Sequence, residues 1–252
     1  MNAAVQTAVL ARRNLLHVLT DPQQLVGMTV QPLMFLLLFV YVFGGAIAGS
    51  AGGYLQFVLP GLLVQGIAFG TAQTAVGLNA DFRTGLIDRF RSLPIARSAV
   101  VAGRVSADLV RAGWAVVINV GVGLALGFRF HGGALGAAGA VGVVLAFGFA
   151  LGWLMACLGV WLRSPESVQT AGFLVVLPLT FASSVLVPAA SMPGWLQAFV
   201  AVNPITPVTD TVRGLMLGGP VGRPAVAAAA WLAGITVVFS VATVRGYSRR
   251  GR

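Results

Sequence analysis

Residues 225–244 have the sequence AVAAAAWLAGITVVFSVATV, a run of 20 residues without a charged side chain. A helix of about 20 apolar residues crosses the ~30 Å hydrocarbon core of a bilayer. Of the 252 residues, 58% are hydrophobic and only 9% are charged, against about 25% charged in a typical soluble domain. Too few polar residues are present to cover a surface that faces water. The sequence therefore predicts an all-α polytopic membrane protein with a single transmembrane domain, residues 1–252.

Five further apolar stretches precede this run, and each approaches or exceeds the length of a transmembrane helix. They cover residues 25–43, 55–78, 105–127, 134–162 and 168–187. The fourth is long enough to require a tilt in the bilayer. We expect six spans in total, with residues 1–20 forming an interfacial helix that lies on the membrane face.

The distribution of arginine predicts the orientation of these spans. All 16 basic residues are arginine, and the net charge is +10. Only three arginines fall on one side of the six spans (Arg129, Arg213 and Arg223), and the other thirteen fall on the side of both termini. Because arginine accumulates at the cytoplasmic ends of helices, both termini are expected in the cytoplasm. The same distribution explains the net charge without a nucleic-acid partner.

Residues 188–223 are too long for a simple turn between the fifth and sixth spans. After Met192-Pro193-Gly194, a helix is predicted because its apolar side chains share one face: Trp195, Leu196, Phe199 and Val200. Asn203-Pro204 breaks this helix, and a second one is expected over residues 207–217. Asp210 and Arg213 in the second helix are three residues apart and can pair. We expect two short amphipathic helices in the outer leaflet.

The composition argues against catalysis by this chain. Without lysine it cannot contain the G-x-x-x-x-G-K-[ST] phosphate loop of nucleotide hydrolases. Its two histidines, His17 and His131, fall on opposite sides of the membrane, and Cys157 is the only cysteine. We therefore expect no catalytic residues, no metal site and no cofactor on this chain.

The densest charge cluster, residues 79–104 (NADFRTGLIDRFRSLPIARSAVVAGR), separates the second span from the third. Asn79 and Asp81 are residue types that begin helices, and Pro94 ends them. A helix here would have an apolar stripe of Phe82, Leu86, Phe90 and Leu93. Such a stripe suits a groove on a partner subunit or a position on the lipid headgroups, and the residues alone leave both open.

Three charges open the third span. Arg104, Asp108 and Arg111 share one helical face, which predicts an ion-paired start of this span near the inner interface. The alternative is that Asp108 couples an ion gradient to transport, although a carboxylate between two arginines is a poor proton shuttle.

Two motifs resemble one family. Residues 83–98 (RTGLIDRFRSLPIARS), followed by Gly103-Arg104 and Asp108, are similar to permease subunits of ABC-2 type exporters, and most similar to the daunorubicin-resistance subfamily. The outer block with Met192-Pro193-Gly194-Trp195, Asn203-Pro204, Asp210 and Arg213-Gly214 resembles the same family in the same order. The resemblance extends over essentially the whole chain.

The resemblance implies a bacterial cell-membrane transporter with two permease copies, identical or paralogous, and two ATPase subunits that hold ATP and magnesium. It implies that residues 79–98 form a cytoplasmic coupling segment whose helix contacts the ATPase through Asp81, Phe82, Arg83, Leu86, Ile87, Asp88, Arg89, Phe90 and Arg91. Substrates of the family include amphipathic drugs, lipids and polysaccharides.

A substrate path can be sought only among polar or aromatic residues within the spans: Gln31, Phe35, Gln65, Phe69, Gln73, Trp114, Asn119, Thr180, Ser183 and Ser184. Most of these are equally suited to ordinary interhelical packing. Two other classes remain open at this point, an ion-gradient-driven carrier and a membrane scaffold that transports nothing.

Overall fold

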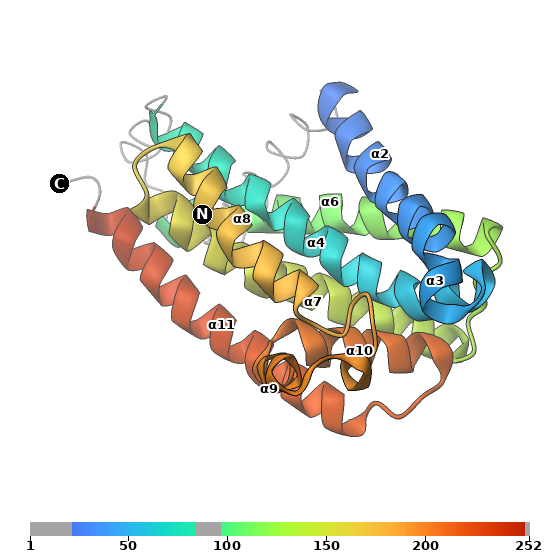
Figure 1. Ribbon diagram of the computed structural model, residues 1–252. Helices are drawn as coiled ribbons and strands as arrows, with labels where there is room; N and C mark the ends of the chain where they lie inside the picture. Colours follow the sequence, from blue (N-terminus) through green and yellow to red (C-terminus); the bar gives the residue numbers. More distant parts are fainter. Residues whose placement is uncertain (1–21, 84–96, 250–252) are drawn as a thin grey trace.

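The computed structural model describes residues 22–83 and 97–249, which form a bundle of helices (Figure 1). Its elements are α2 (Pro22–Leu38), a π-helix (Phe39–Phe43), α3 (Gly44–Ala48), α4 (Ala51–Arg83), α6 (Arg97–Ala125), α7 (Gly133–Trp161), α8 (Pro165–Phe181), a 3-10 turn (Ala189–Ser191), α9 (Gly194–Val202), α10 (Ile205–Leu217) and α11 (Gly222–Arg249). The expected all-α architecture is confirmed for these residues.

Helix α7 lies at the centre of the bundle and contacts α4, α6, α10 and α11. Its glycines permit the close approach: a Cβ atom built on Gly148 would lie 2.9 Å from Ile67 Cγ2, and one on Gly159 would collide with the carbonyl of Ala75. Apolar side chains of α4 and α7 fill the space between these contacts, among them Val144 and Phe147, which are fully buried. Small residues at helix interfaces compensate for the weak hydrophobic drive between helices in lipid.

The two ends of the bundle differ in charge. Helices α4 and α11 end, and α6 begins, at one end, which we call the basic end after Arg83, Arg97 and Arg245. At the opposite end, which we call the α10 end, α10 packs beside the start of α7: the amides of His131 and Gly132 donate to the carbonyl of Met216.

The first transmembrane segment is not one regular helix. Helix α2 contains Pro32 and passes into the π-helix at Phe39, and α3 then ends at Gly49, whose φ of +69° is a left-handed conformation that favours glycine. The chain reverses there into α4. Figure 1 shows α2 leaving the bundle at an angle, so that much of it is exposed. Single π-turns of this kind often mark functional positions in helices.

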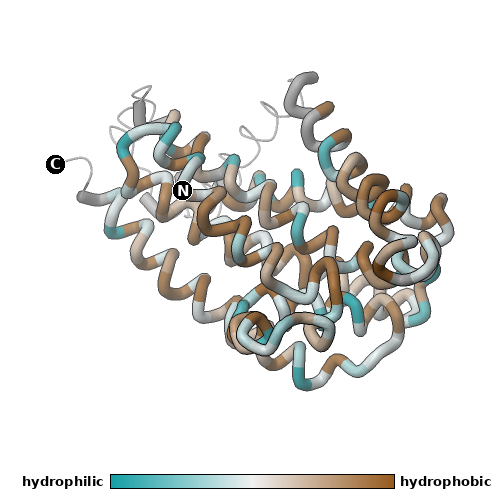
Figure 2. The backbone as a smooth tube through the Cα atoms, viewed as in Figure 1, coloured by the Kyte–Doolittle hydropathy of each residue, from teal (hydrophilic) through white to brown (hydrophobic). Residues whose placement is uncertain are grey.

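Within the described residues, five helices are long and apolar enough to cross a membrane: Thr29–Ile47, Ala51–Ala80, Ala107–Ala125, Gly133–Trp161 and Gly222–Tyr247. Figure 2 shows brown, hydrophobic residues along these helices, interleaved with paler ones. Helix α8, in the fifth expected span, has 17 residues and ends at Phe181, short of the ~20 needed. The count of six spans stays a prediction, and the interfacial helix over residues 1–20 lies outside the described part.

The segment expected over residues 188–223 contains the two short helices α9 and α10, with the second beginning at Ile205 rather than at residue 207. Helix α9 exposes Trp195 to 76%. Helix α10 instead packs against α4, α7 and α11 and buries Val208 and Val212 completely. It is therefore an integral layer of the bundle rather than a surface helix.

The glycine contacts generate a test of the α4–α7 packing. Replacing Gly159 with valine forces side-chain atoms against the Ala75 carbonyl, and overpacking of this kind costs about 1–3 kcal/mol. The same substitution at Gly142 in α7 places the new side chain in open space. Thermal unfolding of the purified protein in detergent should show a lower midpoint for Gly159→Val than for Gly142→Val. Equal midpoints would contradict this account of the packing.

Candidate functional site

Phenylalanines from three helices line up on one side of the bundle. The ring centroids of Phe35 in α2 and Phe69 in α4 are 6.4 Å apart and stacked, and those of Phe69 and Phe173 in α8 are also 6.4 Å apart. Such distances fall within the range of favourable aromatic pairs. These three rings join helices that are far apart in the sequence into one surface.

Polar groups flank this row of rings. Gln31 and Gln73 lie four residues from Phe35 and Phe69 on their own helices, and both are exposed. Beside Phe69, Gly66 and Gly70 leave open space, because a Cβ at either position would meet nothing within 4 Å. We call this surface, formed by Gln31, Phe35, Phe69, Gln73 and Phe173, the aromatic face.

The aromatic face unites four residues that the sequence suggested for a pathway and adds one that it missed. Phe173 is 43% exposed and lies on the outward side of α8. Its only signal in the sequence is that Phe173, Leu177 and Phe181 recur at helical spacing. An apolar stretch offers no contrast by which such a stripe stands out.

The remaining pathway candidates are buried or bonded within the bundle, and Gln65, four residues before Phe69, continues the row of Phe69 and Gln73 on α4. Gln65, Thr180 and Ser183 are buried, and the last two hydroxyls donate to carbonyls of their own segment, Val176 at 2.8 Å and Thr180 at 2.5 Å. On α6, Asn119 donates to the Ala115 carbonyl, and the Trp114 indole donates to Thr29 of α2 at 3.4 Å. These contacts fit interhelical packing.

A second cluster lies at the α10 end and centres on Arg213. Its guanidinium donates to the carbonyls of Phe57 at 3.1 Å and Ser184 at 2.7 Å, and to Asp210 Oδ1 at 3.0 Å. It also lies 3.9 Å above the ring of Phe57, in cation–π geometry. The hydroxyl of Ser184 donates to the same Asp210 oxygen at 2.7 Å. We call these four residues the Arg213 network.

The Arg213 network holds a charge in a largely enclosed place. Burial lowers the pKa of Arg213 to about 10, while Asp210 and the hydroxyl group of Tyr54 raise it. The guanidinium therefore stays protonated at neutral pH. Its contacts span α10, α4 and the turn after α8, so one side chain fixes three segments.

Asn203 joins two helices at the same end. Its amide nitrogen donates to the carbonyls of Leu179 at 2.8 Å and Ala182 at 2.6 Å, and its amide oxygen accepts from the backbone of Ile205 at 2.9 Å. The side chain thus caps the end of α8 and the start of α10. Pro204 stands at the N-cap of α10.

Two of the three charges expected at the start of the third span are paired on α6. Arg111 pairs with Asp108, and both side chains are mostly buried. They flank Leu109, whose Cδ2 would lie 4.0 Å from a Cβ atom built on Gly148 of α7. Gly148 is 15 residues after Gly133 and 13 before Trp161, about 20 Å from either end of α7. The pair lies near the middle of α6 and within the first five residues of the apolar stretch Ala107–Ala125, so its position at the inner interface stays a prediction. Arg104 lies on the same helix.

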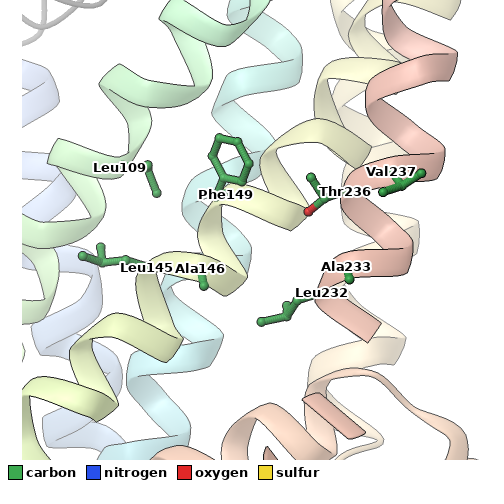
Figure 3. A pocket seen from close by; sticks show the side chains of 8 residues that line it. All are labelled: Leu109, Leu145, Ala146, Phe149, Leu232, Ala233, Thr236 and Val237. Atoms are coloured by element: carbon green, nitrogen blue, oxygen red, sulfur yellow. The ribbon is translucent and has the colours of Figure 1, made fainter. Parts of the chain in front are cut away.

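An open groove lies between α6, α7 and α11 (Figure 3). It has a volume of about 470 Å³ and is lined by Leu109, Leu145, Ala146, Phe149, Leu232, Ala233, Thr236 and Val237. Thr236 supplies the single polar group of this lining. None of the pathway candidates contributes to it.

Comparison with known proteins shows the family. The family model for ABC-2 type transporters matches residues 5–217. The chain belongs to the ABC-2 type transporter family. It is 41% identical to the daunorubicin resistance ABC transporter permease protein DrrB1 of Streptomyces coeruleorubidus, over 91% of this chain and 81% of that protein. It is also 28% identical to the probable doxorubicin resistance ABC transporter permease protein DrrC of Mycobacterium tuberculosis, over 97% and 88% of the two chains.

These relatives are permease subunits of ABC transporters, so the chain is a multi-pass membrane subunit and not an enzyme. The family match covers the aromatic face and the Arg213 network, and it ends at the last residue of α10. A more distant relative, the putative transport permease ycf38 of Cyanophora paradoxa, is 27% identical over 81% of this chain and 72% of its own.

The segment expected to couple this ABC-2 permease to an ATPase falls largely outside the described residues. Asp81, Phe82 and Arg83 are the last residues of α4, and the remaining contacts expected with an ATPase, Leu86 to Arg91, lie in the undescribed stretch 84–96. The expectation that Asn79 and Asp81 begin a helix is wrong, because α4 continues to Arg83. Asn79 instead donates to the carbonyls of Gly159 at 3.1 Å and Leu162 at 2.8 Å, and so caps the end of α7.

Asn203 offers a test of helix capping in this permease. Asn203→Ala removes bonds to two carbonyls and one amide in a buried place, and each unsatisfied group costs about 1–3 kcal/mol. Asn119→Ala is the matched control, since that buried amide bonds only to its own helix. The thermal midpoint should fall clearly further for Asn203→Ala. An equal or smaller fall than for Asn119→Ala would contradict the capping role.

Proposed function

We propose that this chain is the permease subunit of an ATP-driven exporter that moves an amphipathic drug-like or lipid compound out of a bacterial cell. A separate ATPase subunit, which binds ATP and magnesium, would supply the energy. Membership of the ABC-2 family and the similarity to permeases named for daunorubicin and doxorubicin resistance carry this proposal. The ion-gradient carrier and the non-transporting scaffold have no comparable support.

The aromatic face is the surface that we assign to the pathway. Two permease copies, identical or paralogous, would meet there and enclose the substrate between them. Stacked rings bind flat apolar groups, and the exposed amides of Gln31 and Gln73 can bond to a polar part of the same compound. This combination suits an amphipathic substrate.

The basic end would face the cytoplasm, together with both termini. The charges of Arg97, Arg163 and Arg245 support this orientation through the cytoplasmic preference of arginine. The segment after α4 would then reach the ATPase, with the apolar stripe of Phe82, Leu86 and Phe90 seated in a groove of that subunit.

The coupling proposal is tested by a charge in this stripe. Leu86→Asp or Phe90→Asp should abolish substrate-stimulated ATP turnover of the reconstituted complex, because a carboxylate in an apolar groove is not solvated. The amount of permease in the membrane should stay the same. Leu135→Asp, at the 90% exposed start of α7 at the opposite end, is the control and should retain stimulation. Retained stimulation in both stripe variants would refute the coupling assignment.

The pathway proposal is tested by truncating rings. Phe69→Ala and Phe173→Ala each remove a ring that would contact the substrate, and an aromatic contact contributes about 0.5–1.5 kcal/mol, so the substrate concentration for half-maximal ATPase stimulation should rise by about 2- to 12-fold. Phe199→Ala on α9 is exposed but lies outside the aromatic face and should leave this concentration unchanged. Equal behaviour of all three variants would argue against this face as the pathway.

A further inference from the structure

Several buried polar atoms in the described part of the chain have no hydrogen-bond partner, and three of the side chains concerned lie in α10 and in the half of α4 nearest to it. They are Gln65, through both atoms of its amide, and the hydroxyls of Thr206 and Thr209. Gln65 is 3% exposed and Thr209 is 0% exposed. A polar group that is deprived of water and left without a partner destabilises the state in which this happens. Burial of these three side chains therefore costs free energy in the observed arrangement.

All three lie next to the Arg213 network. Thr206, Thr209 and Arg213 follow one another at spacings of three and four residues and so share one face of α10. On α4, Gly61 packs against the backbone of Val185, the residue after Ser184, with no room for a side chain. Gln65 is one turn further along the same face of α4. The unpartnered groups therefore lie on the same faces of α10 and α4 as the contacts of Arg213.

Arg213 has bonds that water can replace. Its carbonyl partners, Phe57 and Ser184, belong to α4 and to the turn after α8, not to α10. A guanidinium is stable when hydrated as well as when bonded to protein, and this residue is at the end of the bundle, where the side chain of Asp210 is 39% exposed. Separation of α10 from α4 would hydrate Arg213 and the three unpartnered side chains together. In the closed arrangement protein groups bond to Arg213, whereas in the open one water would bond to Arg213 and to the three unpartnered side chains.

We infer that the Arg213 network is the latch of a gate at the α10 end. While Arg213 bonds to Phe57 and Ser184, α10 closes the junction over Gln65, Thr206 and Thr209. When these bonds open, α10 moves away from α4 and the turn after α8, and water enters the junction. The gate would serve as the exit of the exporter, and in that respect it rests on the proposed function. The latch itself requires neither substrate nor ATP.

The experiment measures how fast water reaches Thr209. Cys157→Ser removes the single native thiol, and Thr209→Cys then places a reporter of similar size at the junction. The full-length protein in nanodiscs is treated with a charged, water-soluble methanethiosulfonate. We expect slow labelling with Arg213 in place and a rate at least tenfold higher in Arg213→Gln. Arg223→Gln, which removes an exposed arginine at the start of α11, should leave the rate unchanged.

A second reporter separates opening from unfolding. Val144→Cys lies in the fully buried core of α7 and should remain unlabelled in every variant. If Arg213→Gln exposes this core reporter, the milder Arg213→Lys decides: it keeps the charge but cannot span the same acceptors, and should still raise labelling at residue 209 severalfold. Labelling of residue 209 within twofold of the parent in the folded variant overturns the latch.

Failure of the latch is distinguishable from failure of the proposed function. Faster labelling in the Arg213 variants supports the gate even if no ATPase subunit co-purifies with the chain, and in that case the exporter proposal fails alone. Conversely, substrate-stimulated ATP turnover combined with unchanged labelling supports the exporter and overturns the latch.

Discussion

A helix that ends inside a membrane protein exposes carbonyls that no lipid can bond, and this constraint governs the present fold. Three side chains donate hydrogen bonds to such carbonyls. Asn79 of α4 bonds to the end of α7, Asn203 bonds to the end of α8, and Arg213 bonds to the turn that follows α8. Each donor comes from a different segment than its acceptor. The bonds therefore do more than satisfy backbone groups, because they fix which helices lie together and hold α10 within the bundle, whereas α9 is left exposed.

Much of the helical framework was predictable because composition alone determines it. The uncharged run over residues 225–244 lies within α11, and the long stretch over residues 134–162 corresponds to α7. The length of the apolar stretch is sufficient evidence in these cases, because a single segment in lipid can satisfy its backbone hydrogen bonds by itself only as a helix. The pair of short helices before α11 was likewise predictable, because proline and glycine mark their ends. Four members of the aromatic face were recognised as candidates, but not as neighbours.

The rest depended on register and on partners, which a single sequence does not encode locally. Asn79 has the chemistry of a helix start, yet the carbonyls that accept from it lie at the end of α7, about 80 residues away. The pairing of Asp108 with Arg111 was predictable from their spacing, whereas the approach of α6 to α7 beside this pair was not. The π-helix at Phe39 and the packed position of α10 also result from tertiary contacts. Phe173 lay hidden in a stretch where every neighbour is apolar.

Helix α4 connects the parts of this structure that a transporter must couple. Its 33 residues extend about 50 Å, from the Arg213 network past the ring of Phe69 to Arg83, where the proposed coupling segment begins. A continuous helix transmits displacement, since its backbone bonds resist stretching and bending. Pro60 is the exception, because it cannot donate to the carbonyl of Gln56 and so weakens the turn of α4 between these two residues. A push at the basic end would therefore move the aromatic face with α4 and concentrate bending at Pro60. Phe57, whose carbonyl and ring both contact Arg213, lies directly beyond that point.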